Sequence, residues 1–306
     1  MTAPRVVAVV GAGSIGSSWT ALALAQGATV HASDPADGAE ERLRATVADH
    51  LADLDAEESA LDRLRFHADP AAAVSVADFV IEAGPERLDL KRDLFAALDE
   101  AARPDVVLAS SSSGLGPSSF QDACRHPERV LVAHPFNPPH LVPLVEVVGG
   151  RLTSEDAVTS TMAVMSGLGR RPVRVRAELP GHVVNRLQAA LWREAYDLVG
   201  RGAITVADLD AAVASGPGLR WALLGPIATQ HLSGGPGGLA HVLEHLGPPM
   251  VDWWADLREP ALSPQLVEQL VSGVEAELSG REREVLARRD RALVRLLALK
   301  DDEGLR

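Results

Sequence analysis

The N-terminal stretch of the chain joins an apolar run to a glycine pattern that few folds accommodate. Residues 6–10 read Val-Val-Ala-Val-Val, and Gly11, Gly13 and Gly16 follow at once, before an apolar helical pattern begins. Glycines at this spacing permit a tight strand-to-helix turn, close approach of the backbone to a pyrophosphate, and close packing of the helix on the strand. The pattern therefore predicts a βαβ unit whose helix N-terminus binds the phosphates of a dinucleotide.

An acidic residue ends the second predicted strand, at the distance that a dinucleotide-binding unit requires. Asp34 lies 21 residues after Gly13, where a carboxylate can accept hydrogen bonds from the adenosine ribose hydroxyls. No arginine or lysine follows before Arg42, so a 2′-phosphate would meet like charge without a compensating cation. The sequence therefore predicts that NAD, rather than NADP, is bound by Gly11, Gly13, Ser14, Ile15, Gly16 and Asp34.

Two hydrophobic periodicities divide the chain. Up to residue 176, short β-branched runs alternate with helical or polar stretches, which is typical of βαβ units around a mostly parallel sheet. After Pro180 and Gly181 the pattern is helical throughout. We therefore expect an α/β fold, with a Rossmann-type, doubly wound, mostly parallel sheet in residues 1–179 and an all-helical domain in residues 180–306. The expected strands are 5–10, 28–33, 78–82, 105–109, 129–134, 143–148 and 172–176, and the expected helices of the second domain are 182–200, 205–214, 236–246, 263–279 and 281–298.

Charge and composition restrict the class of partner. The 306 residues carry a formal charge of −13 at pH 7, so the chain lacks the basic surface that nucleic acids and anionic membranes require. No apolar run approaches the ~20 residues of a membrane-spanning helix, and the N-terminus lacks the pattern of an export signal. The single cysteine, Cys124, excludes an intrachain disulfide and a multi-thiolate metal site. These features predict a cytoplasmic protein that binds no metal, nucleic acid or membrane and acts on a small molecule.

A histidine and a glutamate in neighbouring predicted strands suggest acid–base chemistry. Glu146 lies in the apolar run Leu-Val-Glu-Val-Val, where a buried carboxylate needs a partner to offset its desolvation. His134 ends the preceding strand and is a natural partner. Such a pair forms a general base, because the carboxylate orients the imidazole and stabilises its protonated form. Each residue alone also has a structural explanation, as does the serine run 110–113, but their combination favours catalysis.

Together these motifs resemble the 3-hydroxyacyl-CoA dehydrogenase superfamily over nearly the whole chain. The resemblance is closest to the L-gulonate 3-dehydrogenase (lambda-crystallin) branch, with carnitine dehydrogenases and polyketide ketoreductases as near relatives. In that family a serine precedes the catalytic histidine by 21 residues and a glutamate follows it by 12, which selects Ser113 and Glu146 around His134. The family motif Pro-Gly-(aromatic)-x-x-Asn-Arg-Leu matches residues 180–187 and selects Asn185.

The resemblance implies a mechanism and an assembly. It implies an NAD-dependent oxidoreductase that moves a hydride between the cofactor and the C3 hydroxyl or ketone of a small 3-hydroxy or 3-oxo acid. It implies that His134 exchanges the hydroxyl proton and that Glu146 stabilises the imidazolium. Ser113 and Asn185 would bind the reacting oxygen. The resemblance further implies a homodimer formed through the helical domain.

Other positions match the family less directly. Glu82 and Glu86 resemble the segment beside the nicotinamide ribose, and a surface location would also explain them. Arg220, in a Gly-Leu-Arg-(aromatic) segment similar to that of the branch acting on free acids, would pair with a substrate carboxylate or form a structural salt bridge. His182 replaces the usual aromatic, so it either lines the cleft or fills the aromatic's place. A shorter acidic segment, 37–62, replaces the insertion that carries basic contacts to CoA.

Several alternatives stay open. The substrate is a gulonate-like, a carnitine-like or a polyketide β-keto acid, or else a CoA thioester of a 3-hydroxy acid. A non-catalytic, crystallin-like protein that holds the cofactor is the alternative outside enzymes. The 6-phosphogluconate-like class of β-hydroxyacid dehydrogenases is excluded, because it needs a catalytic lysine and the chain has none between residues 92 and 299.

Overall fold

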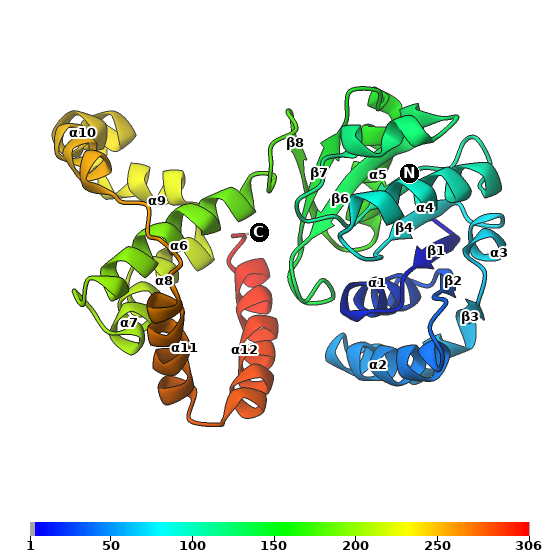
Figure 1. Cartoon of the computed structure of the whole chain (residues 1–306), viewed down its shortest axis with the longest axis horizontal. Coiled ribbons are helices and arrows are strands. Elements are labelled where there is room, and N and C mark those ends of the chain that lie inside the picture. The colour runs from blue at the N-terminus through cyan, green and yellow to red at the C-terminus, as the bar shows by residue number, and fades with distance from the viewer. Residues whose placement is uncertain (1–3, 306) are drawn as a thin grey trace. The chain divides into compact units, whose positions relative to one another are not determined.

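The computed structural model describes residues 4–305, which form two compact units joined in sequence between Arg186 and Leu187. The first unit is built on a mostly parallel sheet with helices on both faces, and the second is helical, so the predicted fold class is confirmed. Figure 1 shows the elements of both units and labels those for which there is room. Residues 180–186 belong to the first unit.

Within residues 4–305 the sheet has eight strands in the order β3-β2-β1-β4-β5-β6-β7-β8. Neighbouring strands are parallel, except that β6 and β7 pair antiparallel. Seven strands correspond to the predicted runs. The unpredicted one is β3, whose sequence Leu-Arg-Phe-His has no β-branched residue and lies at the sheet edge, where a strand pairs on one side only. The strands are β1 (Val6–Val10), β2 (Thr29–Ser33), β3 (Leu64–His67), β4 (Phe79–Glu82), β5 (Leu108–Ser110), β6 (Val130–Pro135), β7 (Leu144–Gly149) and β8 (Arg171–Val175).

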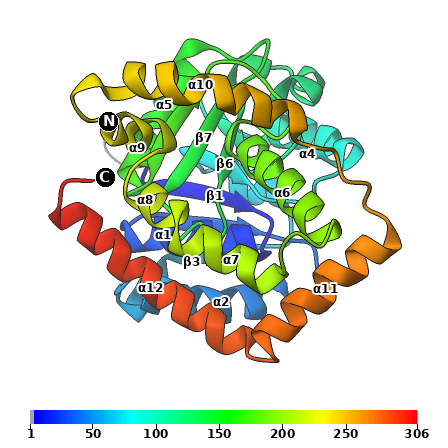
Figure 2. The same ribbon diagram turned by 90° about the vertical axis from the view of Figure 1, so that its left-hand side faces the viewer.

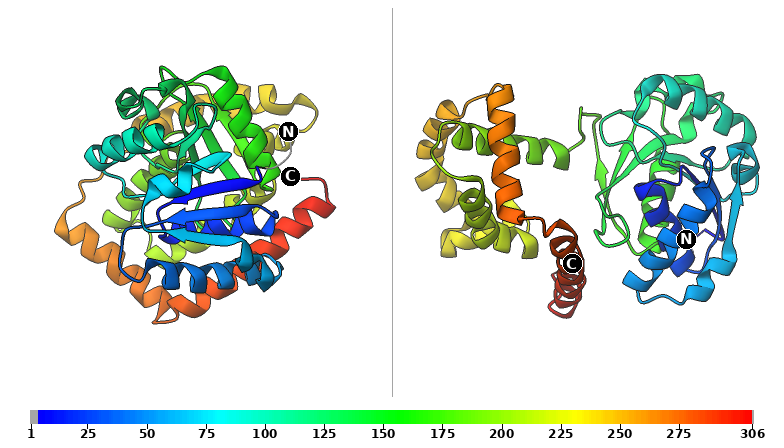
Figure 3. Two further views of the ribbon diagram at one scale, coloured as in Figure 1. Left: turned by 90° about the vertical axis from the view of Figure 1, so that its right-hand side faces the viewer. Right: turned by 60° about the horizontal axis from the view of Figure 1, so that its bottom comes forward.

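The helices of this unit are α1 (Ser14–Ala25), α2 (Ala39–Asp53), α3 (Pro70–Val74), α4 (Leu88–Ala101) and α5 (Glu155–Gly167). Because strand side chains alternate between faces, each face needs its own cover. Val7 and Val9 point to the face where α1, α2 and α5 complete the core. Ala8 and Val10 point to the opposite face, against α3 and α4. The left-hand view of Figure 3 shows the first strands in blue with helices on both sides.

The strand order reverses at β1, whose neighbours are β2 and β4. At such a switch point the following loops diverge and leave a crevice at the carboxyl ends of the strands. Gly11, directly after β1, has a φ of +104°, and a Cβ there would lie 2.5 Å from the carbonyl oxygen of Ala83, directly after β4. Glycine is therefore required at this position, where the backbone after β1 passes close to the backbone after β4.

The second unit contains helices and their connections, with no strand in residues 187–305 (Figure 2). The predicted helix end at residue 246 is wrong, because α10 continues through Pro248 and Pro249. The prediction also missed α8 and α9, although each begins on a Gly-Pro pair with proline in the first turn, which is a known start signal. None of the described helices is both long and apolar enough to cross a membrane. The helices are α6 (Val184–Gly200), which begins in the first unit, α7 (Val206–Ser215), α8 (Pro217–Leu223), α9 (Pro226–Ser233), α10 (Gly238–Asp256), α11 (Pro264–Leu278) and α12 (Glu282–Asp302).

Candidate active site

The glycine loop after β1 has the features of an anion-binding turn. A Cβ at Gly13 would meet no atom within 4 Å, so the loop is open there, whereas a Cβ at Gly16 would overlap the carbonyl oxygen of Gly11. Gly13 caps α1 without a side-chain hydrogen bond, and the first turn of α1 has no acidic residue. A helix N-terminus of this kind attracts an anion through its N–H groups and its dipole. The residues present therefore fit the pyrophosphate of NAD.

Asp34 follows β2 and lies against this loop. Its carboxylate accepts hydrogen bonds from the N–H of Ala12, at 2.8 Å, and from that of Ala36, at 2.9 Å. A carboxylate has about four acceptor positions, so further hydrogen bonds remain open to it. The next cation in the sequence, Arg42, donates to the carbonyl of Asp37. The location agrees with an adenosine ribose site, and the ribose contact itself stays a prediction.

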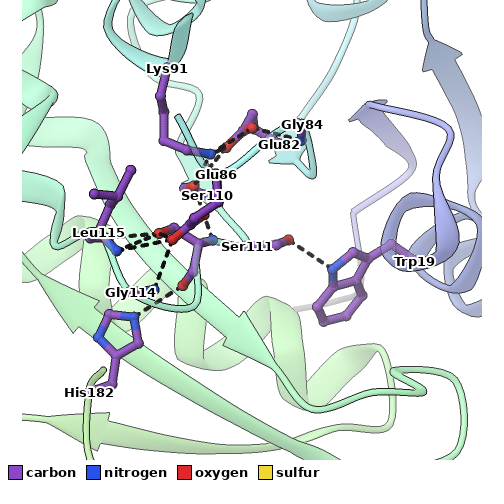
Figure 4. Close-up of polar contacts among 11 residues, drawn as sticks. Trp19, Glu82, Gly84, Glu86, Lys91, Ser110, Ser111, Gly114, Leu115 and His182 are labelled. Atoms are coloured by element: carbon purple, nitrogen blue, oxygen red, sulfur yellow. Dashed lines mark hydrogen bonds and ion pairs between the residues drawn. The ribbon is translucent and has the colours of Figure 1, made fainter. Parts of the chain in front are cut away.

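Glu82 ends β4 with a carboxylate that is 1% exposed and has internal partners (Figure 4). Lys91 of α4 donates to both of its oxygens, at 2.9 and 2.7 Å, and the side chain of Lys91 is buried as well. The hydroxyl of Ser110 and the N–H of Gly84 also donate to this carboxylate. The ion pair accounts for the burial of Glu82 without a cofactor, so a cofactor contact by Glu82 stays a prediction.

Glu86 holds the loop that follows β5. Its Oε1 accepts hydrogen bonds from the hydroxyl of Ser112, at 2.5 Å, and from the N–H groups of Gly114 and Leu115, at 2.9 and 3.1 Å. Burial raises the pKa of Glu86, but these three hydrogen bonds and the charge of Lys91 outweigh it, so the pKa lies below its usual value. Glu86 is therefore an ionised anchor for the loop from which Ser113 projects.

His134 and Glu146 face each other across the antiparallel pair of β6 and β7. Nδ1 of His134 lies 3.0 Å from Oε2 of Glu146, and the two side chains are 5% and 0% exposed. The predicted contact is therefore confirmed. Because an ionised carboxylate only accepts, Nδ1 carries the proton and Nε2 keeps its lone pair. This is the tautomer that a general base needs.

The second oxygen of the Glu146 carboxylate is held where α6 begins. Oε1 accepts hydrogen bonds from the N–H groups of Val183 and Val184, each at 3.0 Å, and the positive end of the helix dipole favours an anion there. Burial raises the pKa of Glu146, but the hydrogen bonds from His134, Val184 and Val183 outweigh it, so the pKa is lowered. Glu146 is therefore a fixed anion positioned to stabilise positive charge on His134.

The other predicted site residues of this unit meet at the loop after β5. Nδ2 of Asn185 donates to the carbonyl of Ser113 at 3.2 Å. Ser113 is exposed, and its hydroxyl has no hydrogen-bond partner among residues 4–305. His182 is fully buried; its Nε2 donates to the carbonyl of Ser112 at 3.1 Å, and its ring centroid lies 5.2 Å from that of His134. The structure thus brings Ser113, Asn185 and His182 together.

Arg220 lies in the second unit, on α8, where its side chain is exposed. It has no carboxylate partner in the part of the chain that the structure describes. The described residues therefore provide no structural salt bridge for it, and its contact with a substrate carboxylate stays a prediction.

Sequence reasoning missed Lys91, and a signal for it was present. Glu82 lies in an apolar strand just as Glu146 does, so the same desolvation argument demands a partner. Lys91 is one of only two lysines in the chain and follows nine residues later. The structure shows that it is the partner of Glu82.

Both parts of the chain resemble proteins of known kind. Residues 6–178 match the NAD-binding domain of 3-hydroxyacyl-CoA dehydrogenase, and residues 181–277 match its C-terminal domain. Two L-carnitine dehydrogenases, from Streptomyces coelicolor and Pseudomonas aeruginosa, are each 46% identical; the alignments cover 97% of this chain and 96% and 94% of the relatives. The crystal structure of 5-formyl-3-hydroxy-2-methylpyridine 4-carboxylic acid 5-dehydrogenase, an NAD⁺-dependent dismutase, superposes with a TM-score of 0.83 at 30% identity and covers 98% of this chain and 99% of that one.

Proposed function

Since this chain belongs to the 3-hydroxyacyl-CoA dehydrogenase family, we propose that it interconverts a small free 3-hydroxy acid of the carnitine type and its 3-oxo acid. Family membership makes it an NAD-dependent dehydrogenase that acts on a CH–OH group. The substrate and the roles of individual residues are the proposed part.

The single observation that carries the proposal is the buried pair of His134 and Glu146. Nε2 of His134 accepts the C3 hydroxyl proton, and the carboxylate 3.0 Å from Nδ1 stabilises the resulting imidazolium. Bound NAD⁺ supplies the acceptor for the hydride that leaves C3. In the reducing direction His134 returns the proton from Nε2. A base positioned in this way contributes roughly 10²- to 10⁴-fold to the rate.

Two further residues hold the substrate. The free hydroxyl of Ser113 and the amide of Asn185, which already donates to the Ser113 carbonyl, bind the reacting oxygen in the proposed arrangement. Glu86 fixes the loop of Ser113 through three hydrogen bonds. The oxygen is thereby held while its proton is transferred, which lowers the entropic part of the barrier.

Charge favours a free acid over a CoA thioester. Helix α2 lies in the acidic segment 37–62 and carries Glu40 and Glu41 in its first turn, where CoA phosphates would be repelled. The net charge of −13 acts in the same direction at longer range. The named function of the relatives at 46% identity supports a carnitine-type substrate. The exposed guanidinium of Arg220 suits a carboxylate, since it donates in a bidentate fork.

A substrate panel tests the proposal. NADH formation is measured with L-carnitine, 3-hydroxybutyrate and L-gulonate, and NADH consumption with acetoacetyl-CoA. We expect the highest kcat/KM for L-carnitine. Acetoacetyl-CoA as the best substrate would favour the thioester alternative, and NAD binding without turnover of any compound would favour a cofactor-holding protein.

Arginine variants test the carboxylate contact separately. Loss of a charged hydrogen bond to substrate in Arg220→Ala should raise KM for the acid by about tenfold or more. Arg258→Ala removes another exposed arginine of the same unit and serves as the matched control. Equal KM values in the two variants would contradict a substrate contact by Arg220.

We further propose that two copies of the chain form a homodimer through the helical unit. Helix α12 buries none of its residues, and large apolar side chains are exposed across the unit, which is typical of an interface. Light scattering after size exclusion should give twice the 32.3 kDa of one chain. Trp254→Glu should lower that mass, whereas Leu152→Glu, in the sheet unit, should not; a monomeric wild type would contradict the proposal. The exposed side chains include Leu219, Ile227, Leu232, Val251, Trp253, Trp254, Leu262, Leu286 and Leu299.

A further inference from the structure

His182 occupies a backbone conformation that residues with side chains rarely adopt. It follows Pro180 and Gly181 with a φ of +52°, and its N–H donates to the carbonyl of Leu179. Left-handed backbone is disfavoured for residues other than glycine. Since the imidazole is nevertheless fully buried, its contacts must hold the turn in this conformation.

The hydrogen bonding of the imidazole fixes its tautomer. Nε2 of His182, whose ring Figure 4 labels, lies 3.1 Å from the carbonyl oxygen of Ser112. A carbonyl only accepts, so Nε2 carries the proton. Nδ1 is buried without a hydrogen-bond partner among the described residues, so a second proton there would have no acceptor. Burial and the neighbouring His134 lower the pKa of His182 and outweigh the Ser112 hydrogen bond and the charges of Glu146 and Glu86, which raise it. The ring is therefore neutral at neutral pH.

The turn of residues 180–184 touches both parts of the site. On one side, His182 binds the carbonyl that directly precedes Ser113 in the chain. On the other side, the next two N–H groups hold Oε1 of Glu146. A shift of this turn would therefore move the loop that carries Ser113 relative to the carboxylate of Glu146, which is paired with His134.

We propose that His182 is a positioning residue: by pinning the Ser112 carbonyl to this turn, it fixes the loop of Ser113 relative to the catalytic base. The inference rests on the proposed function, in which Ser113 binds the reacting oxygen, and it adds a residue that touches neither substrate nor cofactor. In this chain, a ring of the same shape without a donor would leave the buried carbonyl of Ser112 without this partner.

Two substitutions separate the hydrogen bond from the shape of the ring. His182→Phe keeps a ring of similar size without a donor, and His182→Gln places an amide N–H near the position of Nε2. We expect kcat to fall about tenfold in His182→Phe, as for a buried carbonyl left without a donor, with KM for NAD⁺ unchanged. His182→Gln should regain most of that loss. His126→Phe, at a partly exposed histidine of the same unit, should behave as wild type.

Two kinetic outcomes would overturn the proposal. Wild-type kcat in His182→Phe would show that the Ser112 hydrogen bond has no part in positioning. Equal loss in the phenylalanine and glutamine variants would show that the donor is not what matters at this position.

Nitrogen NMR of the histidine rings gives a readout that needs no substrate. The ten histidines of the chain are labelled, and the signals that disappear in His182→Phe are those of His182. We expect a neutral ring with the proton on Nε2 at about pH 6.5, where an ordinary histidine is half protonated. A protonated ring at that pH, or a proton on Nδ1, overturns the inference. The expected tautomer combined with no turnover of any 3-hydroxy acid would show that the proposed function fails.

Discussion

Replacing Glu146 by glutamine tests the proposed role of His134 as the catalytic base with almost no change of volume. The carboxylate is fully buried and accepts hydrogen bonds from His134, Val183 and Val184. Glutamine can keep its carbonyl toward the two backbone N–H groups, but its NH₂ then faces Nδ1 of His134. Because two donors cannot pair, the histidine must move its proton to Nε2, which removes the lone pair that receives the substrate proton in the proposed mechanism.

The expected magnitude follows from the geometry of the pair. Two unit charges 3.0 Å apart attract by about 5.5 kcal/mol at an effective dielectric of ~20. The dipole of the glutamine amide replaces part of this attraction. Each ~1.4 kcal/mol corresponds to tenfold in rate. We therefore expect Glu146→Gln to lower kcat by roughly 10²- to 10⁴-fold. The affinity for NAD⁺ should stay unchanged, because the described contacts of Glu146 do not include the glycine loop.

The assay is single-turnover NADH formation with L-carnitine, together with an NAD⁺ titration followed by protein fluorescence. Glu155→Gln is the matched control, since Glu155 is an exposed glutamate of the same unit paired with Arg174, and it should leave kcat within about twofold. A folded Glu146→Gln protein with kcat within about tenfold of wild type would refute the reasoning.

Three further predictions address the base, the cofactor and acid stability. His134→Ala should lower kcat by roughly 10²- to 10⁴-fold at unchanged NAD affinity; steady-state kinetics showing near wild-type kcat would remove His134 from the mechanism. Asp34→Ser combined with Pro35→Arg should shrink or reverse the preference for NADH over NADPH, with a change of about 10- to 100-fold in the ratio of the two kcat/KM values. A wild type that uses both cofactors equally would show that Asp34 does not contact the ribose. Because the pKa of His182 lies below 6.5 in the folded state, its contribution to stability is present above pH 6.5 and is lost as the pH falls toward that lowered value. His182→Phe should therefore lose less unfolding free energy than wild type between about pH 7.5 and about pH 5.5 in urea titrations; parallel curves for the two proteins would contradict the assignment.

The sequence could predict those elements whose local hydrophobic pattern agrees with their burial in the folded chain. Runs such as Val6–Val10 are buried on both faces of a parallel sheet, so their continuous apolar character identifies them. The strand β3 could not be predicted because Leu64–His67 mixes apolar, basic and titratable side chains at the edge of the sheet. The helix α10 is misjudged at Pro248 because proline usually ends a helix, whereas here the turns on either side continue it.

The site likewise contains one contact that the sequence could predict and one that it could not. The pairing of Glu146 with His134 could be predicted because both lie on neighbouring strands, where register brings opposed residues into contact. The contact of His182 with the Ser112 carbonyl could not, since it joins a left-handed turn to a loop 70 residues away. Main-chain acceptors have no sequence signature, because every residue carries one. The sequence therefore carries no sign of this contact.

The anchoring of Glu146 by backbone N–H groups of residues 183 and 184 also determines how this site can diverge. Every amino acid except proline has the same backbone N–H donor. The hydrogen bonds to the carboxylate therefore do not depend on which side chains occupy positions 183 and 184. In an alignment of related sequences we expect these two columns to vary while their spacing from the turn is kept. The turn would then tolerate nearly any replacement at these columns, yet gaining or losing one residue would detach the carboxylate from the helix.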